Sequence, residues 1–190
     1  GEGGCLLVND KSFHEMADMV HEKGTDRTKF MQGLVDKYSW QTIGSSFLPG
    51  EIMAAFLYAQ LKEACNITQK RREIWAYYDL CFQGSINEIV ELPSIDLTLE
   101  NENAHMYAVK VNSFQKRGDL IKSCQTNNIS PVFHYVPLHN SAAGLTYCRS
   151  SGSMINTEHE SQRLLRLPLW IGIDADELVN QFKKSVHLLN

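Results

Sequence analysis

The sequence lacks the features that would tie it to a membrane, a metal or an oxidising compartment. Its 190 residues contain no apolar run long enough to span a membrane and no signal-peptide pattern of a secreted protein. No membrane partner is therefore expected. The cysteines are odd in number, widely spaced and free of any CxxC pair, which argues against a metal or a dithiol site. Scattered thiols fit a reducing cytoplasm, where we expect the protein. They are Cys5, Cys65, Cys81, Cys124 and Cys148.

Several binding and catalytic motifs are also missing. The net charge is -4, and the densest basic run, Lys70-Arg71-Arg72, lies inside a helical pattern. A nucleic-acid partner is therefore not expected. No His-Glu pair extends to HExxH, and no GxSxG, Walker or GxGxxG sequence occurs. Metalloprotease, acyl-hydrolase, P-loop and dinucleotide-binding functions are excluded at the level of the motif.

What is present is the composition of an ordinary globular protein. Hydrophobic residues make up 43% of the chain and charged residues 21%. A chain of this length and composition can bury a core, either as one domain or as two small ones.

The first quarter of the sequence predicts a strand, a helix and a long loop. Residues 4–9 are a short apolar run typical of a buried strand. Ser12 and Glu15 have the spacing of a capping box, and the apolar residues that follow predict a helix from Phe13 that ends at Gly24. Residues 25–49 keep no period, which is typical of a functional loop.

A long helix is expected next. Pro49 suits the first turn of a helix, because its missing N–H costs nothing there. The apolar pattern then continues to about Phe82, with a bend expected near Asn66. Residues 84–103 are polar and rich in turn formers, so we interpret them as a linker.

The remaining residues alternate between strand and helix patterns. Thr157 and Glu160 have capping-box spacing before an apolar pair, Leu164 and Leu165, and Asp174 has the same relation to Glu177. This order predicts a small two-layer α/β domain. The expected strands are 105–111, 131–135 and 167–171, and the expected helices are 113–127 and the segment after Asp174.

Two short segments carry candidate binding residues. Ser45 and Ser46 precede the long helix, where hydroxyls and free N–H groups suit a phosphate or carboxylate; a simple helix cap is the alternative. His134 and His139 flank Pro137, which places them on a strand end and the loop after it, where α/β proteins collect functional groups. A hydrogen-bonded structural histidine is the alternative. A metal site would need a third ligand, for which only His105 offers itself, so no metal is expected.

Taken in order, several segments resemble one family, the DegT/DnrJ/EryC1/StrS sugar aminotransferases, over essentially the whole chain. The similarity is greatest to members acting at C4 of dTDP-linked 4-keto-6-deoxy sugars, for surface polysaccharides such as lipopolysaccharide and the enterobacterial common antigen. The segments that carry it are 1–4 (GEGG), 22–27 (EKGTDR), 35–40 (VDKYSW), 43–49 (IGSSFLP), 91–93 (ELP), 103–106 (NAHM), 133–139 (FHYVPLH) and 161–169 (SQRLLRLPL).

The resemblance implies a fold and a division of the chain. The fold is α/β, the C-terminal part of the pyridoxal-phosphate-dependent aspartate aminotransferase fold. Residues 1–49 would form the end of the large cofactor domain with its active-site loop, 50–83 the long linking helix, and 84–190 the small two-layer α/β domain. In the family the Schiff-base lysine lies a few residues before the GEGG turn, so it would lie upstream of residue 1.

The resemblance also implies binding residues and partners. The cofactor is pyridoxal 5'-phosphate, and Ser45 and Ser46 would approach its phosphate in the neighbouring subunit of a homodimer with a shared site. Ser46 and Leu48 stand where many relatives have Asn and Arg. Tyr38 and Trp40 would lie near the shared site. The substrates would be glutamate and a nucleotide sugar, with the sugar bound by His134, Tyr135 and His139.

The resemblance leaves a second function open. The same fold can bind a cofactor or a sugar nucleotide without transamination, or serve as a dimerising module. The residue upstream of Gly1 that corresponds to the cofactor lysine separates the two: a lysine favours the enzyme, and its replacement favours the binding protein.

Overall fold

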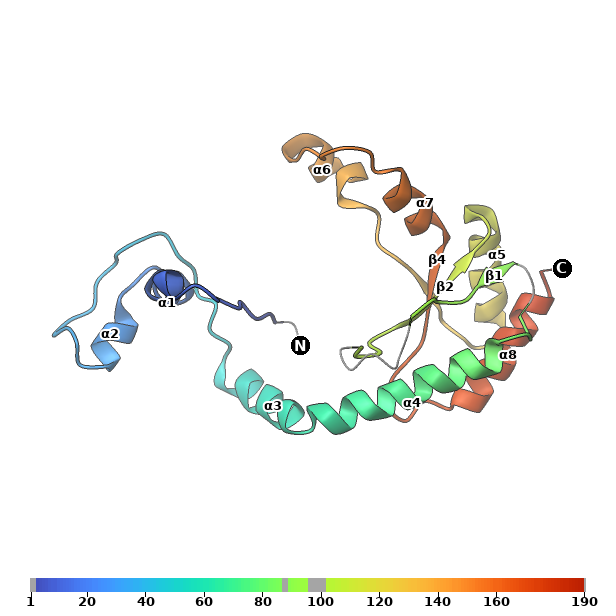
Figure 1. The fold of residues 1–190 in the computed structure, drawn as a ribbon, viewed down its shortest axis with the longest axis horizontal. Helices are drawn as coiled ribbons and strands as arrows, with labels where there is room; N and C mark the ends of the chain where they lie inside the picture. The colour runs from blue at the N-terminus through green and yellow to red at the C-terminus, as the bar shows by residue number, and fades with distance from the viewer. Residues whose placement is uncertain (1–2, 87–88, 96–101, 190) are drawn as a thin grey trace. The chain divides into compact units, whose positions relative to one another are not determined.

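The computed structural model describes residues 3–86, 89–95 and 102–189, and it divides into two compact units, Gly1–Glu63 and Ala64–Asn190. Each unit is described by itself (Figure 1). The first holds short helices joined by loops. The second holds a sheet and the buried core.

Unit 1 begins with a 3-10 turn, Lys11–Phe13, that leads into helix α1, His14–His21. The predicted helix is confirmed, but the predicted capping box is wrong. Asp10 is the cap: its carboxylate accepts the Ser12 N–H at 2.9 Å and the Ser12 hydroxyl at 2.7 Å. An aspartate caps a helix end as well as a serine does, and here it comes two residues earlier.

The predicted strand at residues 4–9 is wrong, because these residues take no regular structure and do not lie buried. Leu6 is 77% exposed and Leu7 is 81% exposed. A strand exists only when another segment pairs with its backbone. Among the described residues, none does so here.

The predicted long helix is two helices, α3 (Glu51–Lys62) and α4 (Ala64–Phe82), and the interruption falls at Glu63 rather than near Asn66. Pro49 lies outside α3, because Gly50, with extended backbone angles, is its N-cap. The two helices also differ in burial. None of the α3 side chains is buried, whereas α4 buries Trp75 and two further aromatic residues.

Unit 2 is built on an antiparallel sheet in the order β1-β2-β4-β3. The register pairs Val90 with Val111, Val109 with Leu165, and Phe133 with that same Leu165. The strands are β1 (Val90–Glu91), β2 (Tyr107–Val111), β3 (Val132–Phe133) and β4 (Leu164–Leu167).

Two expectations about this sheet are wrong. The segment interpreted as a linker contains β1, although 87–88 and 96–101 of that segment lie outside the described residues. The last strand is Leu164–Leu167 instead of 167–171. Leu165 and Leu167 alternate inward with period two, and Pro168, which has no N–H to donate, follows the strand.

The helices of unit 2 are α4, α5 (Phe114–Thr126), α6 (Ala142–Tyr147), α7 (Ile155–Arg163) and α8 (Ala175–His187), with a 3-10 turn at Leu138–Asn140. The predicted cap at Asp174 is confirmed, because its carboxylate accepts the Glu177 N–H at 2.9 Å. The structure adds a second cap, Ser113, whose hydroxyl accepts the Lys116 N–H at 3.2 Å. The Thr157 capping box is wrong, because Thr157 lies inside α7.

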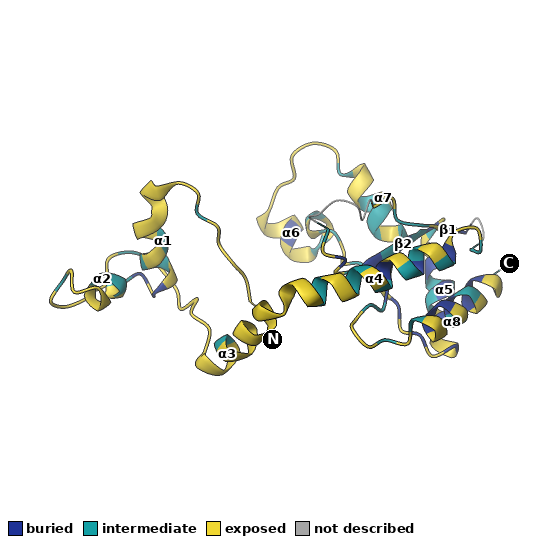
Figure 2. Ribbon diagram, turned by 60° about the horizontal axis from the view of Figure 1, so that its bottom comes forward, coloured by how far each residue is buried: buried dark blue, intermediate teal, exposed yellow. Residues whose placement is uncertain are grey.

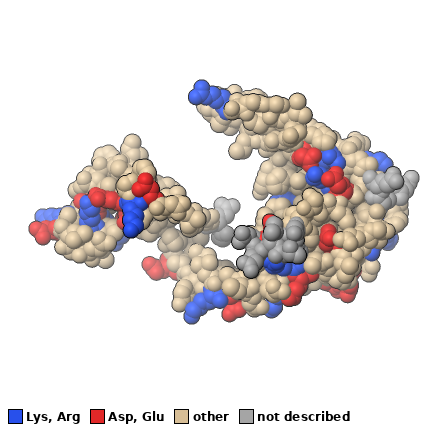
Figure 3. All heavy atoms as spheres, viewed as in Figure 1, with Lys and Arg blue, Asp and Glu red and all other residues tan. Residues whose placement is uncertain are grey.

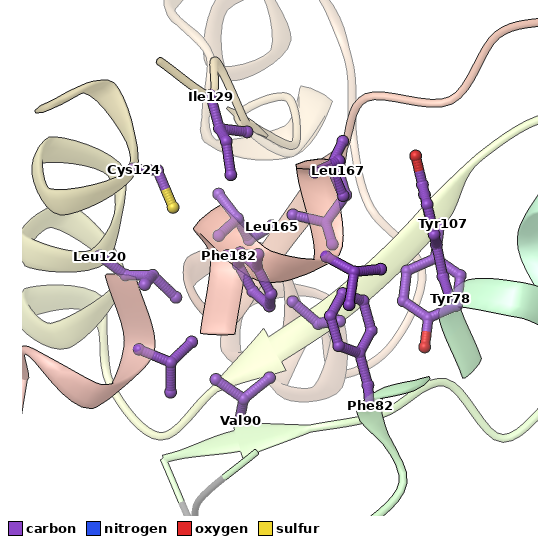
Figure 4. Packing of buried hydrophobic residues seen from close by; sticks show 14 of the residues in the cluster. Tyr78, Phe82, Val90, Tyr107, Leu120, Cys124, Ile129, Leu165, Leu167 and Phe182 are labelled. Carbon is purple, nitrogen blue, oxygen red and sulfur yellow. The ribbon is translucent and has the colours of Figure 1, made fainter. Parts of the chain in front are cut away.

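The core of unit 2 lies between one face of the sheet and helices α4, α5 and α8, as the close view in Figure 4 shows. Aromatic rings join these layers. The Phe82 ring lies 5.8 Å from Tyr107 of β2 and 5.2 Å from Phe182 of α8, measured between centroids. This is the predicted two-layer arrangement. No helix among the described residues is both long enough and apolar enough to span a membrane.

Candidate functional site

The residues selected from the sequence fall into two groups, one in each unit. Tyr38, Trp40, Ser45 and Ser46 belong to unit 1, whereas His134, Tyr135 and His139 belong to unit 2.

Ser45 and Ser46 lie beside the end of α1, five or more residues before α3 begins, so the expectation of a helix N-terminus at these serines is wrong. The Ser45 N–H donates to Val20 O at 3.1 Å, and the Ser45 carbonyl accepts the Lys23 N–H at 3.0 Å. Both serine side chains are exposed, and in the part of the chain that the structure describes neither hydroxyl has a hydrogen-bond partner. Two consecutive residues therefore have exposed hydroxyls that make no hydrogen bond among the described residues.

Two glycines allow this close packing. Gly24 has a φ of 74°, and a Cβ there would collide with the carbonyl oxygen of Thr42. A Cβ on Gly44 would collide with the backbone of Gly24. The segment that carries Ser45 therefore approaches the α1 end at backbone contact, which only glycine permits at these two positions.

Tyr38 and Trp40 lie on a turn held by Asp26. One Asp26 carboxylate oxygen accepts the Ser39 N–H at 2.6 Å, and the other accepts the Gln41 side-chain amide at 3.1 Å. Trp40 pairs with Thr25 through its backbone while its side chain is 75% exposed. The turn therefore fixes the backbone and leaves the indole free.

A buried carboxylate lies next to this turn. Glu22 is 7% exposed and contacts Lys23 at 3.0 Å and Arg27 at 3.1 Å. The hydrogen bond from Lys23, assisted by Arg27, lowers the pKa of Glu22. No sequence motif pointed to a role for Glu22 or Asp26. The only sequence signal for these two residues was their place in the EKGTDR segment. Their side-chain contacts could not be predicted, because they depend on how the loop folds.

In unit 2 the loop after β3 carries His134 and Tyr135, whose ring centroids lie 5.7 Å apart. The Arg166 guanidinium lies over the Tyr135 ring at 5.5 Å. His139 has a different environment: its Nε2 lies 3.1 Å from a carboxylate oxygen of Glu158 on α7. The His139 ring is thus oriented by a partner, which leaves its Nδ1 as the nitrogen for a ligand.

Charges of both signs are interspersed over the face of the molecule that Figure 3 shows. One group of charges in unit 2 joins Lys110, Glu160 and Glu91, with 2.9 Å from the Lys110 ammonium to Glu160 and 3.2 Å to Glu91. The described residues contain no cluster of three or more side chains that could hold a metal ion.

The unit 2 sheet with its three helices on one face, preceded by the α1 segment and the Ser45 loop, is the C-terminal part of the pyridoxal-phosphate-dependent aminotransferase fold. An aminotransferase from Streptoalloteichus hindustanus, TlmJ, superposes with a TM-score of 0.78 at 18% identity, over 95% of this chain and 46% of that one. A sugar aminotransferase from Streptococcus pneumoniae, Spr1654 in its PMP form, gives a TM-score of 0.74 at 20% identity, covering 96% and 47%.

The chain belongs to the DegT/DnrJ/EryC1/StrS aminotransferase family, which matches residues 1–183. A UDP-4-amino-4,6-dideoxy-N-acetyl-beta-L-altrosamine transaminase from Helicobacter pylori is 27% identical, over 73% of this chain and 35% of the relative. A dTDP-3-amino-3,6-dideoxy-alpha-D-galactopyranose transaminase from Aneurinibacillus thermoaerophilus is 26% identical, over 74% and 35%. The chain thus spans about a third of the curated relatives it matches. Members of the family use pyridoxal phosphate.

Proposed function

We propose that this chain supplies the C-terminal part of a nucleotide-sugar aminotransferase that moves an amino group from glutamate to C4 of a dTDP-linked 4-keto-6-deoxy sugar. The family match over residues 1–183 carries the proposal. When bound, pyridoxal phosphate supplies the electron sink for moving the amino group. The residues of this chain bind and orient the cofactor phosphate and the substrates.

Ser45 and Ser46 fit a phosphate. Their hydroxyls are exposed and unpartnered among the described residues, and the backbone beneath them is fixed by the contacts of Val20 and Lys23. A hydroxyl held on a fixed backbone donates to a phosphate oxygen with little loss of side-chain freedom. In the proposed enzyme these hydroxyls hold the cofactor phosphate of the partner subunit in a homodimer.

The substrate side is assigned to aromatic and imidazole groups. Trp40 and Tyr38 offer apolar ring faces suited to a sugar ring or a nucleotide base, and the Asp26 contacts keep their turn in place. His134, Tyr135 and His139 offer hydrogen bonds to sugar hydroxyls or phosphate oxygens. Because Glu158 accepts a hydrogen bond from His139, the imidazole is held in one orientation when the sugar binds.

Unit 1 supports the proposed dimer through its surface. Helix α3 exposes Ile52, Phe56 and Leu61 at 88%, 71% and 63%, and Figure 2 shows α3 coloured almost entirely as exposed. A helix that exposes this many large apolar side chains is typical of a segment covered in a larger assembly. In the proposed enzyme, the large domain and the second subunit cover it.

The proposal has two direct tests. Purified chain mixed with pyridoxal phosphate and then borohydride should show no stoichiometric adduct at one dominant lysine, because no lysine of this chain stands where the family resemblance implies the cofactor lysine. A single stoichiometric adduct would contradict that assignment. In the complete enzyme, Ser46→Asp should weaken cofactor retention, because it sets a negative charge against a phosphate. Ser153→Asp, a substitution of an exposed serine in unit 2, is the matched control.

The same enzyme distinguishes transamination from simple binding. Release of 2-oxoglutarate from glutamate, coupled to amination of the keto sugar, supports the proposed reaction. Binding of cofactor and nucleotide sugar without either half-reaction would instead support a non-catalytic module of the same fold.

A further inference from the structure

Two nitrogen atoms, one in the loop after β3 and one on β4, lack hydrogen-bond partners among the described residues. Nδ1 of His134 and Nε of Arg166 are buried atoms, and neither makes a hydrogen bond among the described residues. Buried polar atoms in folded proteins are normally paired with protein groups, water or ligand. Two such atoms beside one loop indicate a polar group that binds there.

The Arg166 guanidinium is held in place without being neutralised. One Nη donates to the Phe133 carbonyl at 3.3 Å, and the guanidinium carbon lies 5.5 Å from the centre of the Tyr135 ring. Within the described part of the chain no carboxylate pairs with it. Arg163, three residues earlier, differs: its guanidinium contacts Glu91 at 3.1 Å and Glu160 at 3.3 Å.

His134 lies on the same side of the loop as Arg166. Val132 is directly opposite Arg166 in the β3–β4 pair, and residues two apart along an extended segment share a face. The His134 and Arg166 side chains both contact Tyr135, the former with ring centroids 5.7 Å apart. The Tyr135 hydroxyl, on a side chain that is 74% exposed, also has no partner among the described residues.

We propose that Arg166 and His134 form an oxyanion-binding site beside Tyr135, which takes a carboxylate or a phosphate group. A guanidinium presents its N–H donors in a planar fork that matches the two oxygens of either group. His134 Nδ1 and the Tyr135 hydroxyl add donors from the neighbouring side. Arg166 already has its stacking contact and its carbonyl contact, so the oxyanion meets a donor whose orientation is fixed.

This site deepens the proposed function and rests on it only for the identity of the anion. Both substrate types of the proposed reaction carry oxyanions, the carboxylates of glutamate and the diphosphate of the nucleotide sugar. Binding itself is a property of the 190-residue chain and needs neither cofactor nor turnover.

The test is a titration of the chain, without cofactor, with sodium pyrophosphate, with inorganic phosphate and with glutarate. Imidazole nitrogen shifts of His134 and ring proton shifts of Tyr135, followed by NMR, report local binding. Arg166→Gln is expected to weaken the preferred anion by roughly tenfold or more, as the loss of a charge-assisted contact does. Arg149→Gln removes the same charge from an exposed side chain with no contact among the described residues, and should change binding less than about twofold.

Arg166→Lys keeps the positive charge but removes the planar set of guanidinium N–H donors. It is the variant to measure if Arg166→Gln does not fold. An affinity between those of the unmodified chain and Arg166→Gln supports the site. Stronger binding of pyrophosphate assigns it to a phosphate, and stronger binding of glutarate to a carboxylate. Absence of saturable binding, or equal loss in the Arg166 and Arg149 variants, overturns the proposal. A failed transamination assay of the complete enzyme with this binding intact would instead count against the proposed function alone.

Discussion

The two units bury very different shares of their apolar residues. Every member of the hydrophobic core, from Trp75 to Val186, belongs to unit 2. Among the described residues of unit 1 only Glu22 and Gly24 are buried, whereas Phe56 and Trp40 are exposed. Figure 2 shows little of the buried colour in α1, α2 and α3. Unit 2 is thus stabilised by its own core, while unit 1 is held by backbone contacts and ion pairs. An apolar surface without its own core is expected to serve in assembly.

The largest expected effect is a core truncation in unit 2. Phe182 is fully buried against Phe82, so Phe182→Ala should lower the free energy of unfolding by about 3–5 kcal/mol. Phe56→Ala removes the same ring from an α3 side chain that is 71% exposed and should cost less than about 0.5 kcal/mol. Denaturant unfolding of both variants measures the difference. Equal losses would show that unit 1 has a core of its own.

Alkaline pH should also act on unit 2. Burial raises the pKa of Tyr78 to about 12, and burial, together with Asp79, raises the pKa of Tyr107 further. Both hydroxyls remain neutral in the fold while the unfolded chain ionises near pH 10. Stability is therefore complete below pH 10 and falls above it, by up to about 1.4 kcal/mol per pH unit for Tyr78 until about pH 12.

The measurement is unfolding at about pH 9, 10 and 11, with tyrosinate absorbance followed in parallel. Tyr78→Phe removes the titrating hydroxyl together with its 3.1 Å contact to Pro168 O. That variant should lose less stability between the first and last pH than the unmodified chain does. A pH dependence that is the same in both would exclude Tyr78 as its source.

These contrasts also explain what the sequence could predict. The cap at Asp174 was predicted correctly, because a side chain that bonds its own backbone three residues away is a local feature. The strand at 4–9 was not, because strand pairing depends on a distant segment. The last strand was predicted too far along the chain, because Leu164 and Leu165 follow a capping-box pattern that is typical of a helix. In the structure these two residues pair in the sheet instead.

The candidate site divides in the same way. Sequence motifs led to the Ser45 segment and to the His134 loop, and their roles remain predictions. Arg166 was missed because the sequence does not show which groups surround a side chain. Only the folded structure reveals that, among the described residues, no carboxylate pairs with Arg166 and its Nε has no hydrogen-bond partner. Asp26 was missed because its contacts reach residues 13 and 15 positions away.

In unit 1 the glycine contact is the expected weak point. Gly24→Ala combines a positive φ with a collision against Thr42 O, so it should open the Ser45 segment and cost more than about 1 kcal/mol locally. Gly33→Ala is the matched control, because Gly33 has the same φ of 74° with nothing within 4 Å of the added Cβ. Amide hydrogen exchange of Ser45 and Phe47 reports the opening. Equal exchange in the two variants would assign the effect to φ alone.

The smallest change in stability is expected from removing the lysine of an ion pair, which can be done in either unit. In unit 2 the Lys110 ammonium, which contacts Glu160 at 2.9 Å, is the main cause of the lowered pKa of Glu160. The stability from this contact is present above the ordinary pKa near 4.5 and is lost as pH falls through the lowered value. Because both side chains are more than a third exposed, Lys110→Gln should cost no more than about 1 kcal/mol at neutral pH.

Lys23→Gln is the counterpart in unit 1, where Lys23 is the first cause of the lowered pKa of Glu22. Since Glu22 is buried while Glu160 is not, salt should screen the Lys110 contact more than the Lys23 contact. NMR titration of the two carboxyl groups, at low and at high salt, measures both. In Lys110→Gln the pKa of Glu160 should rise and depend less on salt, with Arg163 as its remaining cationic contact at 3.3 Å, while the pKa of Glu22 stays unchanged. A Glu22 pKa that is as sensitive to salt as that of Glu160 would mean that unit 1 opens to solvent around its one buried carboxylate.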